Sequence, residues 1–294
     1  MLYLSPLRYP GGKRKLASFV KLIFYTNNLL DGEYVEPYAG GASIALSLLY
    51  DEYVRRIHIN DIDKSVYAFW YSVLNETESL CRLVRDTPVT IEEWQRQRKI
   101  QNDPYATKIE LGFSTFFLNR TNRSGIISGG VIGGKNQTGK WLLDARYNRS
   151  ELITRIEKVA RYRHRISLHN LDAINFLQLI TPQLNQHALI YLDPPYFVKG
   201  PQQLYTNFYG PKDHQSVAQF VQQLQSQYWI VSYDDVPEIH ELYKGFRYVT
   251  YGLHYSAQDR YRGAEVMFFS NNLDIPDVAD PAKIKGKMLQ HFLV

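Results

Sequence analysis

The sequence Asp193-Pro194-Pro195-Tyr196 places a carboxylate, a peptide carbonyl and an aromatic ring directly after an apolar run at 188–192. The two prolines fix the backbone φ angle and cannot extend a strand, so the Asp193 carboxylate and the Pro194 carbonyl become fixed acceptors. Two acceptors can take both hydrogens of an exocyclic amino group while Tyr196 stacks on the ring that carries it. The segment predicts a site for a flat, amino-bearing ring, and the alternative is a simple strand-ending turn.

A glycine turn follows the first apolar run of the chain, where residues 36–42 read EPYAGGA. Small residues let a ligand approach the backbone closely, and the N–H groups that begin the next helix attract a carboxylate or a phosphate. The dinucleotide pattern GxGxxG is not met, and a plain tight turn explains the glycines about as well.

Two acids, Asp61 and Asp63, follow the second apolar run at 56–60. They lie about twenty residues after the glycines, where an acid can accept hydrogen bonds from a ribose. We favour Asp61 for this role because Asp63 is better placed to cap a helix over 64–74.

Two further segments combine basic and polar side chains. Residues 8–13 read RYPGGK, which by itself is a basic turn with an aromatic ring. Residues 118–125 read LNRTNRSG and lead into a glycine-rich loop at 128–139. The forked polar side chains of the second segment could read base edges in a groove.

Short apolar runs predict the strands that must position these segments. A helix at 42–49 follows the first of them through the glycines, as in a parallel α/β layer. Ligands of such sheets bind beyond the carboxyl ends of the strands, where residues 193–196 would lie. The expected strands are 34–38, 56–60, 166–169, 188–192 and 228–232, with an antiparallel pair at 248–253 and 265–270.

The middle of the chain differs from the rest, with helical periodicity over 91–118 and then a loop rich in Gly, Ser and Asn. Residues 82–165 hold seventeen Lys and Arg against eight Asp and Glu, although the whole chain has a net charge of only +5. Basic and aromatic residues alternate there, which suits phosphates and base faces, so nucleic acid is the leading partner over a solvated surface. The expected division is a split α/β catalytic domain at 1–74 and 166–271, an insert at 75–165 and a tail at 272–294.

Composition excludes several classes of protein. With 294 residues, 45% hydrophobic and 21% charged, the chain is typical of a globular protein. The single Cys81 has no partner for an intrachain disulfide, and no Cys/His cluster has zinc-ligand spacing, so we expect no metal and a reducing compartment. The absence of eighteen consecutive apolar residues argues against a membrane span, and the basic start argues against secretion.

Together, and in this order, the four segments resemble the Dam-type (D12 class, alpha group) DNA adenine-N6 methyltransferases, which use S-adenosylmethionine. The resemblance covers residues 5–271. It implies a Rossmann-like methyltransferase sheet, mostly parallel with an antiparallel C-terminal strand, plus a small, mainly helical target-recognition insert. The implied reaction moves a methyl group from S-adenosylmethionine to the N6 amino group of a flipped-out adenine in double-stranded DNA.

The resemblance also implies roles for individual residues. Asp193, Pro194, Pro195 and Tyr196 would form the methyl-acceptor site. The cofactor residues would be Tyr9, Gly11, Gly12, Lys13, Glu36, Pro37, Tyr38, Ala39, Gly40, Asp61, Ile62, Asp172 and Asp193. The DNA contacts would be Arg120, Asn122, Arg123, Ser124, Lys135 and Lys140.

Two residues and one loop limit what the resemblance implies. A helix N-cap explains Asp172 equally well. Ala42 stands where many members of the family have a third glycine, although alanine keeps the approach close. The glycine-rich loop is unusually long, which leaves the DNA sequence preference open.

The expected partner is double-stranded DNA, with no membrane, and the enzyme would act as a cytoplasmic, nucleoid-associated monomer. A cognate restriction endonuclease, as in a restriction-modification pair, is a further possible partner. Two alternatives keep the methyl-transfer chemistry: a cytosine-N4 methyltransferase and an RNA adenine methyltransferase. A third alternative is a DNA-binding regulator that has this fold but no catalytic activity. A phosphate-loop nucleotidase is disfavoured because residues 129–136 read GGVIGGKN, and Asn136 lacks the hydroxyl that binds magnesium.

Overall fold

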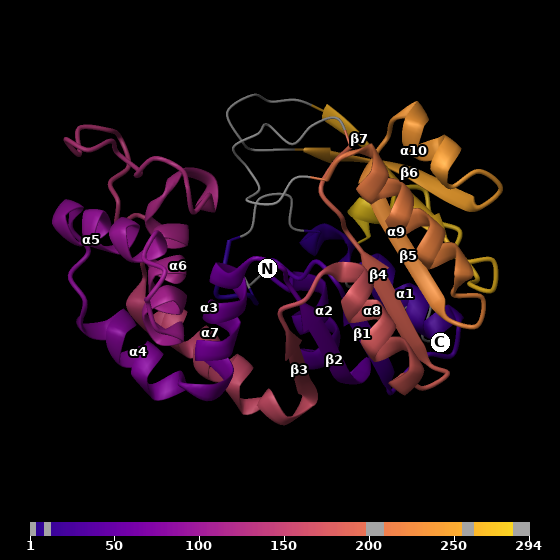
Figure 1. The fold of residues 1–294 in the computed structure, drawn as a ribbon, viewed down its shortest axis with the longest axis horizontal. Coiled ribbons are helices and arrows are strands. Elements are labelled where there is room, and N and C mark those ends of the chain that lie inside the picture. Colours follow the sequence, from indigo (N-terminus) through magenta and orange to yellow (C-terminus); the bar gives the residue numbers. More distant parts are fainter. Residues whose placement is uncertain (1–3, 9–12, 198–208, 255–261, 285–294) are drawn as a thin grey trace.

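A single seven-stranded sheet forms the centre of the molecule (Figure 1). The computed structural model describes residues 4–8, 13–197, 209–254 and 262–284. The strands are β1 (Gly32–Glu36), β2 (Val54–Asn60), β3 (Ile166–His169), β4 (Ala188–Leu192), β5 (Tyr228–Asp234), β6 (Arg247–His254) and β7 (Arg262–Phe269), in the order β3-β2-β1-β4-β5-β7-β6. Strands pair in parallel from β3 to β5, and β7 runs antiparallel between β5 and β6. The predicted mostly parallel sheet with an antiparallel C-terminal strand is confirmed.

Helices surround this sheet, and none of those in the described residues is long and apolar enough to cross a membrane. They are α1 (Ala17–Thr26), α2 (Ser43–Tyr50), α3 (Lys64–Asn75), α4 (Thr77–Asp86), α5 (Ile91–Gln101), α6 (Lys108–Thr121), α7 (Arg149–Arg161), α8 (Ala173–Ile180), α9 (Pro211–Gln223) and α10 (Pro237–Leu242). Short 3-10 turns lie at Arg14–Leu16, Arg123–Gly125, Arg163–Arg165, Thr181–Gln183 and Pro281–Lys283.

The apolar core has two parts, one on each face of the sheet. Leu189 and Tyr191 of β4 belong to the part that includes α1 and α2, whereas Ile190 and Leu192 belong to the part that includes α8, α9 and α10. Successive side chains of a strand point to opposite faces, so a strand buried on both faces is apolar throughout. This explains why the apolar run predicted β4 with its correct ends.

Strand β1 lies two residues earlier than the predicted 34–38. Gly32 already pairs with Val54 of β2, so the pairing begins before the apolar run. Pro37 has no N–H to donate, and the strand ends at Glu36. The glycine turn therefore begins directly at the sheet edge.

Residues 75–165 are mainly helical and extend from one side of the sheet (Figure 1). The helical stretch predicted over 91–118 is divided into two helices, because Thr107 begins α6 with a capping box. Helix α6 packs against α3, where the rings of Phe69 and Phe116 stack with centroids 6.0 Å apart. One apolar core therefore runs from the sheet into the insert, and the domain boundaries stay predictions.

Candidate active site

The order of the parallel strands reverses between β1 and β4, which lie side by side in the sheet. Their register pairs Val35 with Ile190, so Glu36 and Asp193 leave the sheet at neighbouring positions. Open α/β sheets bind their ligands at such reversal points, beyond the carboxyl ends of the strands. The structure thus brings together the two segments that are far apart in the sequence.

Three charged side chains meet at this edge. The ammonium of Lys13 lies 3.0 Å from Oδ1 of Asp193 and 3.1 Å from Oε2 of Glu265 on β7. Oδ1 of Asp193 also accepts a hydrogen bond of 3.0 Å from the hydroxyl of Ser232 on β5. The hydrogen bonds and ion pairs that described residues make with Asp193 thus fall on Oδ1, and none of them involves Oδ2.

Exposure separates these three residues. The side chains of Lys13 and Glu265 are 3% and 1% exposed, whereas the side chain of Asp193 is 23% exposed. The lysine and the glutamate are therefore internal, and the carboxylate of the predicted acceptor site is the one that reaches outward.

The pKa values of these groups follow from burial and from their mutual charges. Burial alone lowers the pKa of Lys13, but the carboxylates of Asp193 and Glu265 outweigh it and raise this pKa well above its usual value. Burial raises the pKa of Asp193, and the charge of Glu265 adds to this effect while Lys13 opposes it. Lys13 therefore stays a cation and favours the ionised form of Asp193.

Tyr196 is fixed through its hydroxyl. The hydroxyl donates a hydrogen bond to Oε1 of Glu265 and accepts one of 3.1 Å from Lys13. The next residue is also held, because the backbone N–H of Phe197 donates to Asp234 at 2.9 Å. Pro194 is buried and Pro195 half-buried, so the four predicted acceptor residues lie together at the end of β4.

Asp61 closes the glycine turn. Its Oδ2 accepts from the N–H of Gly40 at 2.9 Å, and its Oδ1 accepts from the N–H of Asp63 at 3.0 Å. Gly40 and Ala42 both have positive φ angles of 45° and 47°, a conformation that glycine adopts at lower cost than alanine. The conformation of the turn is therefore fixed by the acid that was predicted to meet a ribose.

Two carboxyl groups near the turn have displaced pKa values. Burial raises the pKa of Asp61 to about 7, although the N–H groups of Asp63 and Gly40 lower it. Burial and the charge of Asp193 raise the pKa of Glu36 well above its usual value. One oxygen of Glu36, Oε2, is buried and has no hydrogen-bond partner among the described residues. The hydroxyl of Tyr34 lies near this carboxyl and opposes the rise of its pKa, so Glu36 also faces an internal donor.

The other predicted cofactor residues differ in exposure and in the hydrogen bonds that they already make. Ile62, beside Asp61, is 42% exposed, which is unusual for so large an apolar side chain. Asp172 is the N-cap of α8, because its side chain accepts hydrogen bonds from the N–H groups of Ile174 and Asn175. The alternative of a helix N-cap at Asp172 is therefore confirmed. Pro37 and Ala39 are buried in the turn. Tyr38 is half-buried, and its hydroxyl lies 3.0 Å from the hydroxyl of Tyr209. The structure does not describe Tyr9, Gly11 and Gly12.

Asn119 joins the N-terminal segment to the insert. It accepts from the N–H of Arg8 at 2.8 Å, and it donates to the carbonyls of Arg8 and Gly125 at 2.7 and 2.8 Å. Gly125 has a φ of 80°, and a Cβ there would lie 2.5 Å from the Arg8 carbonyl. The LNR segment is thus fastened to the segment that precedes the predicted cofactor turn.

Two of the predicted DNA contacts are buried. The guanidinium of Arg120 donates a hydrogen bond to the carbonyl of Pro6. The side chain of Asn122 accepts a hydrogen bond from the indole N–H of Trp94 and donates to the carbonyls of Ile126 and Ile127. Burial, together with the charges of Arg155 and Arg8, lowers the pKa of Arg120 to about 9.

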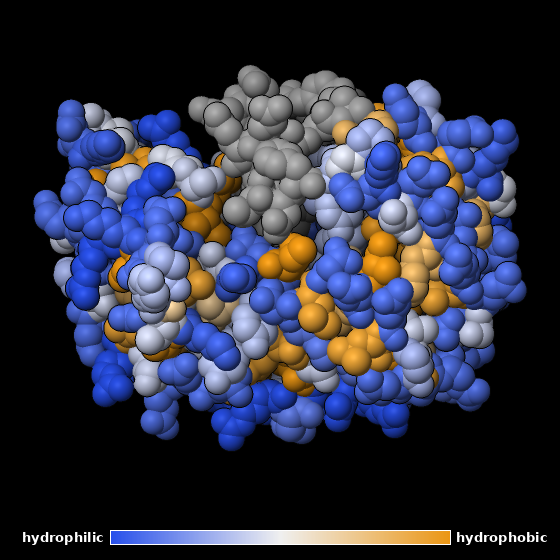
Figure 2. Space-filling view, in the orientation of Figure 1, coloured by the Kyte–Doolittle hydropathy of each residue, from blue (hydrophilic) through white to orange (hydrophobic). Residues whose placement is uncertain are grey.

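The remaining predicted contacts lie at the surface. Arg123, Lys135 and Lys140 are exposed, and Ser124 is half-buried with a φ of 56°. Beside Lys140, the ring of Trp141 is 66% exposed. Figure 2 shows mainly hydrophilic side chains over the insert, with smaller apolar areas between them. A polar, basic surface with an exposed tryptophan beside Lys140 is thus available here.

Sequence reasoning missed Glu265, Ser232 and Asn119 as members of the site. The signal for Glu265 is a charged residue within the apolar strand RGAEVMFF, and Ser232 similarly interrupts YWIVSYD. Polar residues inside fully buried strands need partners, so both patterns indicate a polar cluster.

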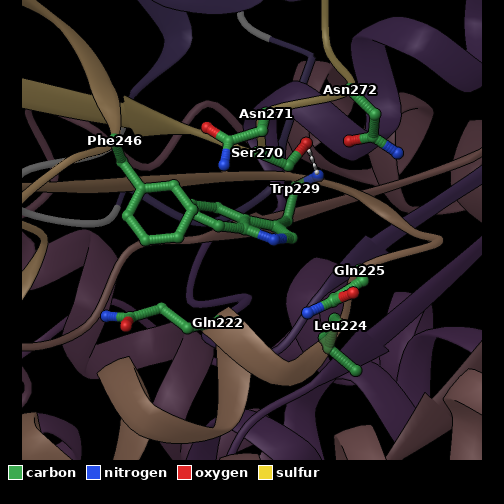
Figure 3. Close-up of a pocket in the computed structure, with 8 residues that line it drawn as sticks. All are labelled: Gln222, Leu224, Gln225, Trp229, Phe246, Ser270, Asn271 and Asn272. Carbon is green, nitrogen blue, oxygen red and sulfur yellow. Dashed lines mark hydrogen bonds between the residues drawn. The ribbon is translucent and has the colours of Figure 1, made fainter.

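A separate pocket of about 330 Å³ lies at the opposite edge of the sheet, where β5 begins and β7 ends (Figure 3). It is lined by Gln222, Leu224, Gln225, Trp229, Phe246, Ser270, Asn271 and Asn272. None of these is an acid or a base, and the Ser270 hydroxyl accepts from the N–H of Trp229 at 3.1 Å. Across the described parts of the chain, no group of three or more His, Cys, Asp or Glu could hold a metal.

Comparisons with known proteins bear on the fold and the family. A SAM-dependent methyltransferase from Agrobacterium tumefaciens is similar at 8% identity and a TM-score of 0.41, with 86% of this chain and 60% of that protein covered. Protein LPL1258 from Legionella pneumophila is similar at 13% identity and a TM-score of 0.33, with 96% and 92% covered. This chain therefore spans less than two thirds of the first protein. No curated protein matches the sequence.

The family is established by a match over most of the chain. Residues 9–257 match the model of the D12 class N6 adenine-specific DNA methyltransferases. This range includes the basic turn, the glycine turn, the LNR segment and residues 193–196, so the resemblance drawn from these motifs is confirmed. The chain belongs to the D12 class of N6 adenine-specific DNA methyltransferases, whose methyl donor is S-adenosylmethionine.

Proposed function

We propose that the protein transfers a methyl group from S-adenosylmethionine to the N6 amino group of an adenine that is flipped out of double-stranded DNA. The observation that carries this proposal is the outward-facing Asp193 carboxylate, held through Oδ1 by Lys13 and Ser232 at the strand-order reversal. Its Oδ2, to which no described residue donates, and the adjacent Pro194 carbonyl would be the two acceptors that one amino group needs.

The arrangement addresses the weak nucleophilicity of adenine. The lone pair of its amino nitrogen is delocalised into the ring, so the site must favour the pyramidal form that appears as attack begins. Acceptors at Asp193 and Pro194 bind more strongly as positive charge develops on that nitrogen, which stabilises the transition state in particular. One lysine faces two carboxylates in this cluster, so the cluster has a net negative charge. This charge also favours the positive charge that develops on the amino nitrogen.

The turn residues fit S-adenosylmethionine. Asp61 and the unpartnered Oε2 of Glu36 are acceptors for hydroxyl or amino groups, and exposed Ile62 can pack against an adenine ring. No side chain caps the first turn of α2 after Ala42, so its N–H groups can receive a carboxylate. When bound, S-adenosylmethionine supplies an electrophilic methyl group on its sulfonium.

The insert fits a phosphate backbone. Arg120 is buried close to Arg8, Arg146 and Arg155, with Glu151 as the acid that opposes their effect. A phosphate near this group would offset the like charges, and Arg123, Lys135 and Lys140 would add contacts along the backbone. Unstacking a base costs a few kcal/mol, which these contacts and the acceptor site must offset.

The proposal is tested by incubating the protein with unmethylated duplex DNA, or with RNA, and S-adenosylmethionine that carries a labelled methyl group. Digestion to nucleosides identifies the product, and we expect the label in N6-methyldeoxyadenosine. Label in N4-methyldeoxycytidine or only in RNA would replace the proposed acceptor. No incorporation with either nucleic acid would contradict methyl transfer altogether.

A further inference from the structure

Glu265 is the most buried charged group of the site, with its side chain 1% exposed. Its Oε1 accepts from the hydroxyl of Tyr196 and from Lys13 at 3.3 Å. Its Oε2 accepts from the hydroxyl of Tyr251 at 2.6 Å and lies 3.1 Å from Lys13. A buried carboxylate is costly unless it is fully paired, and each oxygen here has a phenol and the shared ammonium.

The antiparallel strand β7 brings Glu265 to this position. Glu265 pairs with Asp234 of β5 on one side and with Tyr251 of β6 on the other. Residues paired across strands point to the same face of a sheet, so these three side chains form one polar row. Two members of the row hold consecutive residues, since Glu265 accepts from the hydroxyl of Tyr196 and Asp234 accepts from the N–H of Phe197, which directly follows it.

The hydrogen bond to Tyr196 restricts an aromatic ring. A tyrosine side chain rotates about two bonds, and an anchored hydroxyl at its far end removes most of that freedom. The ammonium of Lys13 lies 5.0 Å from the centre of the same ring, so Lys13 and Glu265 both contact it. The orientation of the ring therefore depends on a residue about seventy positions away in the sequence.

We propose that Glu265 is a positioning residue for methyl transfer, which fixes the Tyr196 ring for the target base and holds Lys13 against Asp193. This inference rests on the proposed function. Glu265 contacts neither reacting atom and acts through the Tyr196 hydroxyl and the Lys13 ammonium. Loss of its charge lowers the rate of the bound complex and leaves the binding of S-adenosylmethionine and DNA nearly unchanged.

The test compares methyl transfer by the wild type, Glu265→Gln, Tyr196→Phe and the double variant. We expect kcat to fall about 10- to 100-fold in each single variant, with KM for both substrates within about threefold of the wild type. Because Tyr196→Phe removes the hydrogen bond through which Glu265 acts on the ring, the double variant should lose little more than the worse single variant. A fully multiplicative loss would overturn the route through Tyr196.

Glu33→Gln is the matched control. Glu33 is a buried glutamate in a strand, but it pairs with Arg55 and His58 away from residues 193–196. We expect its kcat to equal that of the wild type, since neither partner belongs to the site. An equal loss of kcat in Glu33→Gln would show that any buried glutamate matters, which would overturn a specific role for Glu265.

The wild-type reaction separates this inference from the proposed function. If the wild type forms no N6-methyladenine, the proposed function fails and the inference fails with it. If the wild type is active and Glu265→Gln equals it in kcat, only the inference fails. Should Glu265→Gln not fold, Tyr196→Phe decides alone, because it keeps the charge of Glu265 beside Lys13, and wild-type kcat in that variant overturns the inference.

Discussion

Two buried cations distinguish the catalytic edge of the sheet from the insert. Lys13 lies between Asp193 and Glu265, whose charges raise its pKa well above the usual value. Arg120 is equally buried, but burial and the nearby Arg155 and Arg8 lower its pKa to about 9. The first cluster contains charges of both signs without a ligand, whereas the second contains an excess of positive charge.

This difference indicates two ways of preparing a site. At the proposed catalytic edge, the protein supplies both signs of charge, so the proposed acceptor geometry would exist before the substrate binds. In the insert, the arginines outnumber the single nearby acid, Glu151, and a polyanion can supply the missing negative charge. Catalysis and DNA binding should therefore respond to different substitutions.

Asp193→Ala should have the largest effect on activity. Removing one of two acceptors should lower the rate of methyl transfer about 10³-fold, because the developing charge on the amino nitrogen loses its partner. DNA affinity, measured by electrophoretic mobility shift, should stay within about threefold of the wild type. Turnover close to the wild-type rate would contradict the assignment of Asp193.

Lys13→Met tests whether the catalytic cluster is complete. It leaves the carboxylates of Asp193 and Glu265 close together without their cation, with Glu265 only 1% exposed. We expect the free energy of unfolding, measured in urea, to fall by about 3–5 kcal/mol. A variant as stable as the wild type would show that Lys13 does not hold this cluster together.

Arg120→Met is the matching substitution in the insert and should give the opposite pattern. Relief of like charge from Arg8 and Arg155 offsets the lost hydrogen bond to Pro6, so we expect unfolding to change by less than about 1 kcal/mol. DNA affinity should fall about tenfold, and its logarithmic dependence on salt should weaken by about 0.9. A large loss of stability with an unchanged salt dependence would make Arg120 structural only.

The smallest expected effect is a pH dependence of cofactor affinity. Burial raises the pKa of Asp61 to about 7, and the ionised carboxylate is the better acceptor for ribose hydroxyls. Affinity measured by calorimetry should therefore rise about tenfold from pH 6 to pH 8 and then level off. Asp61→Asn should remove this rise in affinity, whereas the control Glu36→Gln should retain it. A rise that persists in Asp61→Asn would contradict the role of Asp61 as an acceptor for the ribose.

The sequence predicts the sheet and the segments at its edge because both depend on local patterns. The ends of β4 are correct since a strand buried on both faces is a continuous apolar run. The ends of β3, a half-buried edge strand, are also correct. The neighbourhood of Glu36 and Asp193 also follows, because strand ends in parallel sheets meet at one edge.

The polar partners of the site depend on the register of distant strands, which local patterns do not contain. Glu265 reaches Tyr196 only because β7 lies antiparallel between β5 and β6. Similarly, the LNR motif marks the place of Arg120 and Asn122 in the chain but does not reveal that both side chains are buried. Motifs therefore indicate which segments meet at the sheet edge, and only the structure shows which of their side chains are buried.

The most direct test of the central claim is the position of the target base in a crystal structure with cofactor product and a duplex that contains the methylated site. The account predicts an extruded adenine whose N6 lies about 2.7–3.2 Å from both the Asp193 carboxylate and the Pro194 carbonyl. An adenine that remains stacked in the duplex, or whose N6 is bound by other groups, would contradict it.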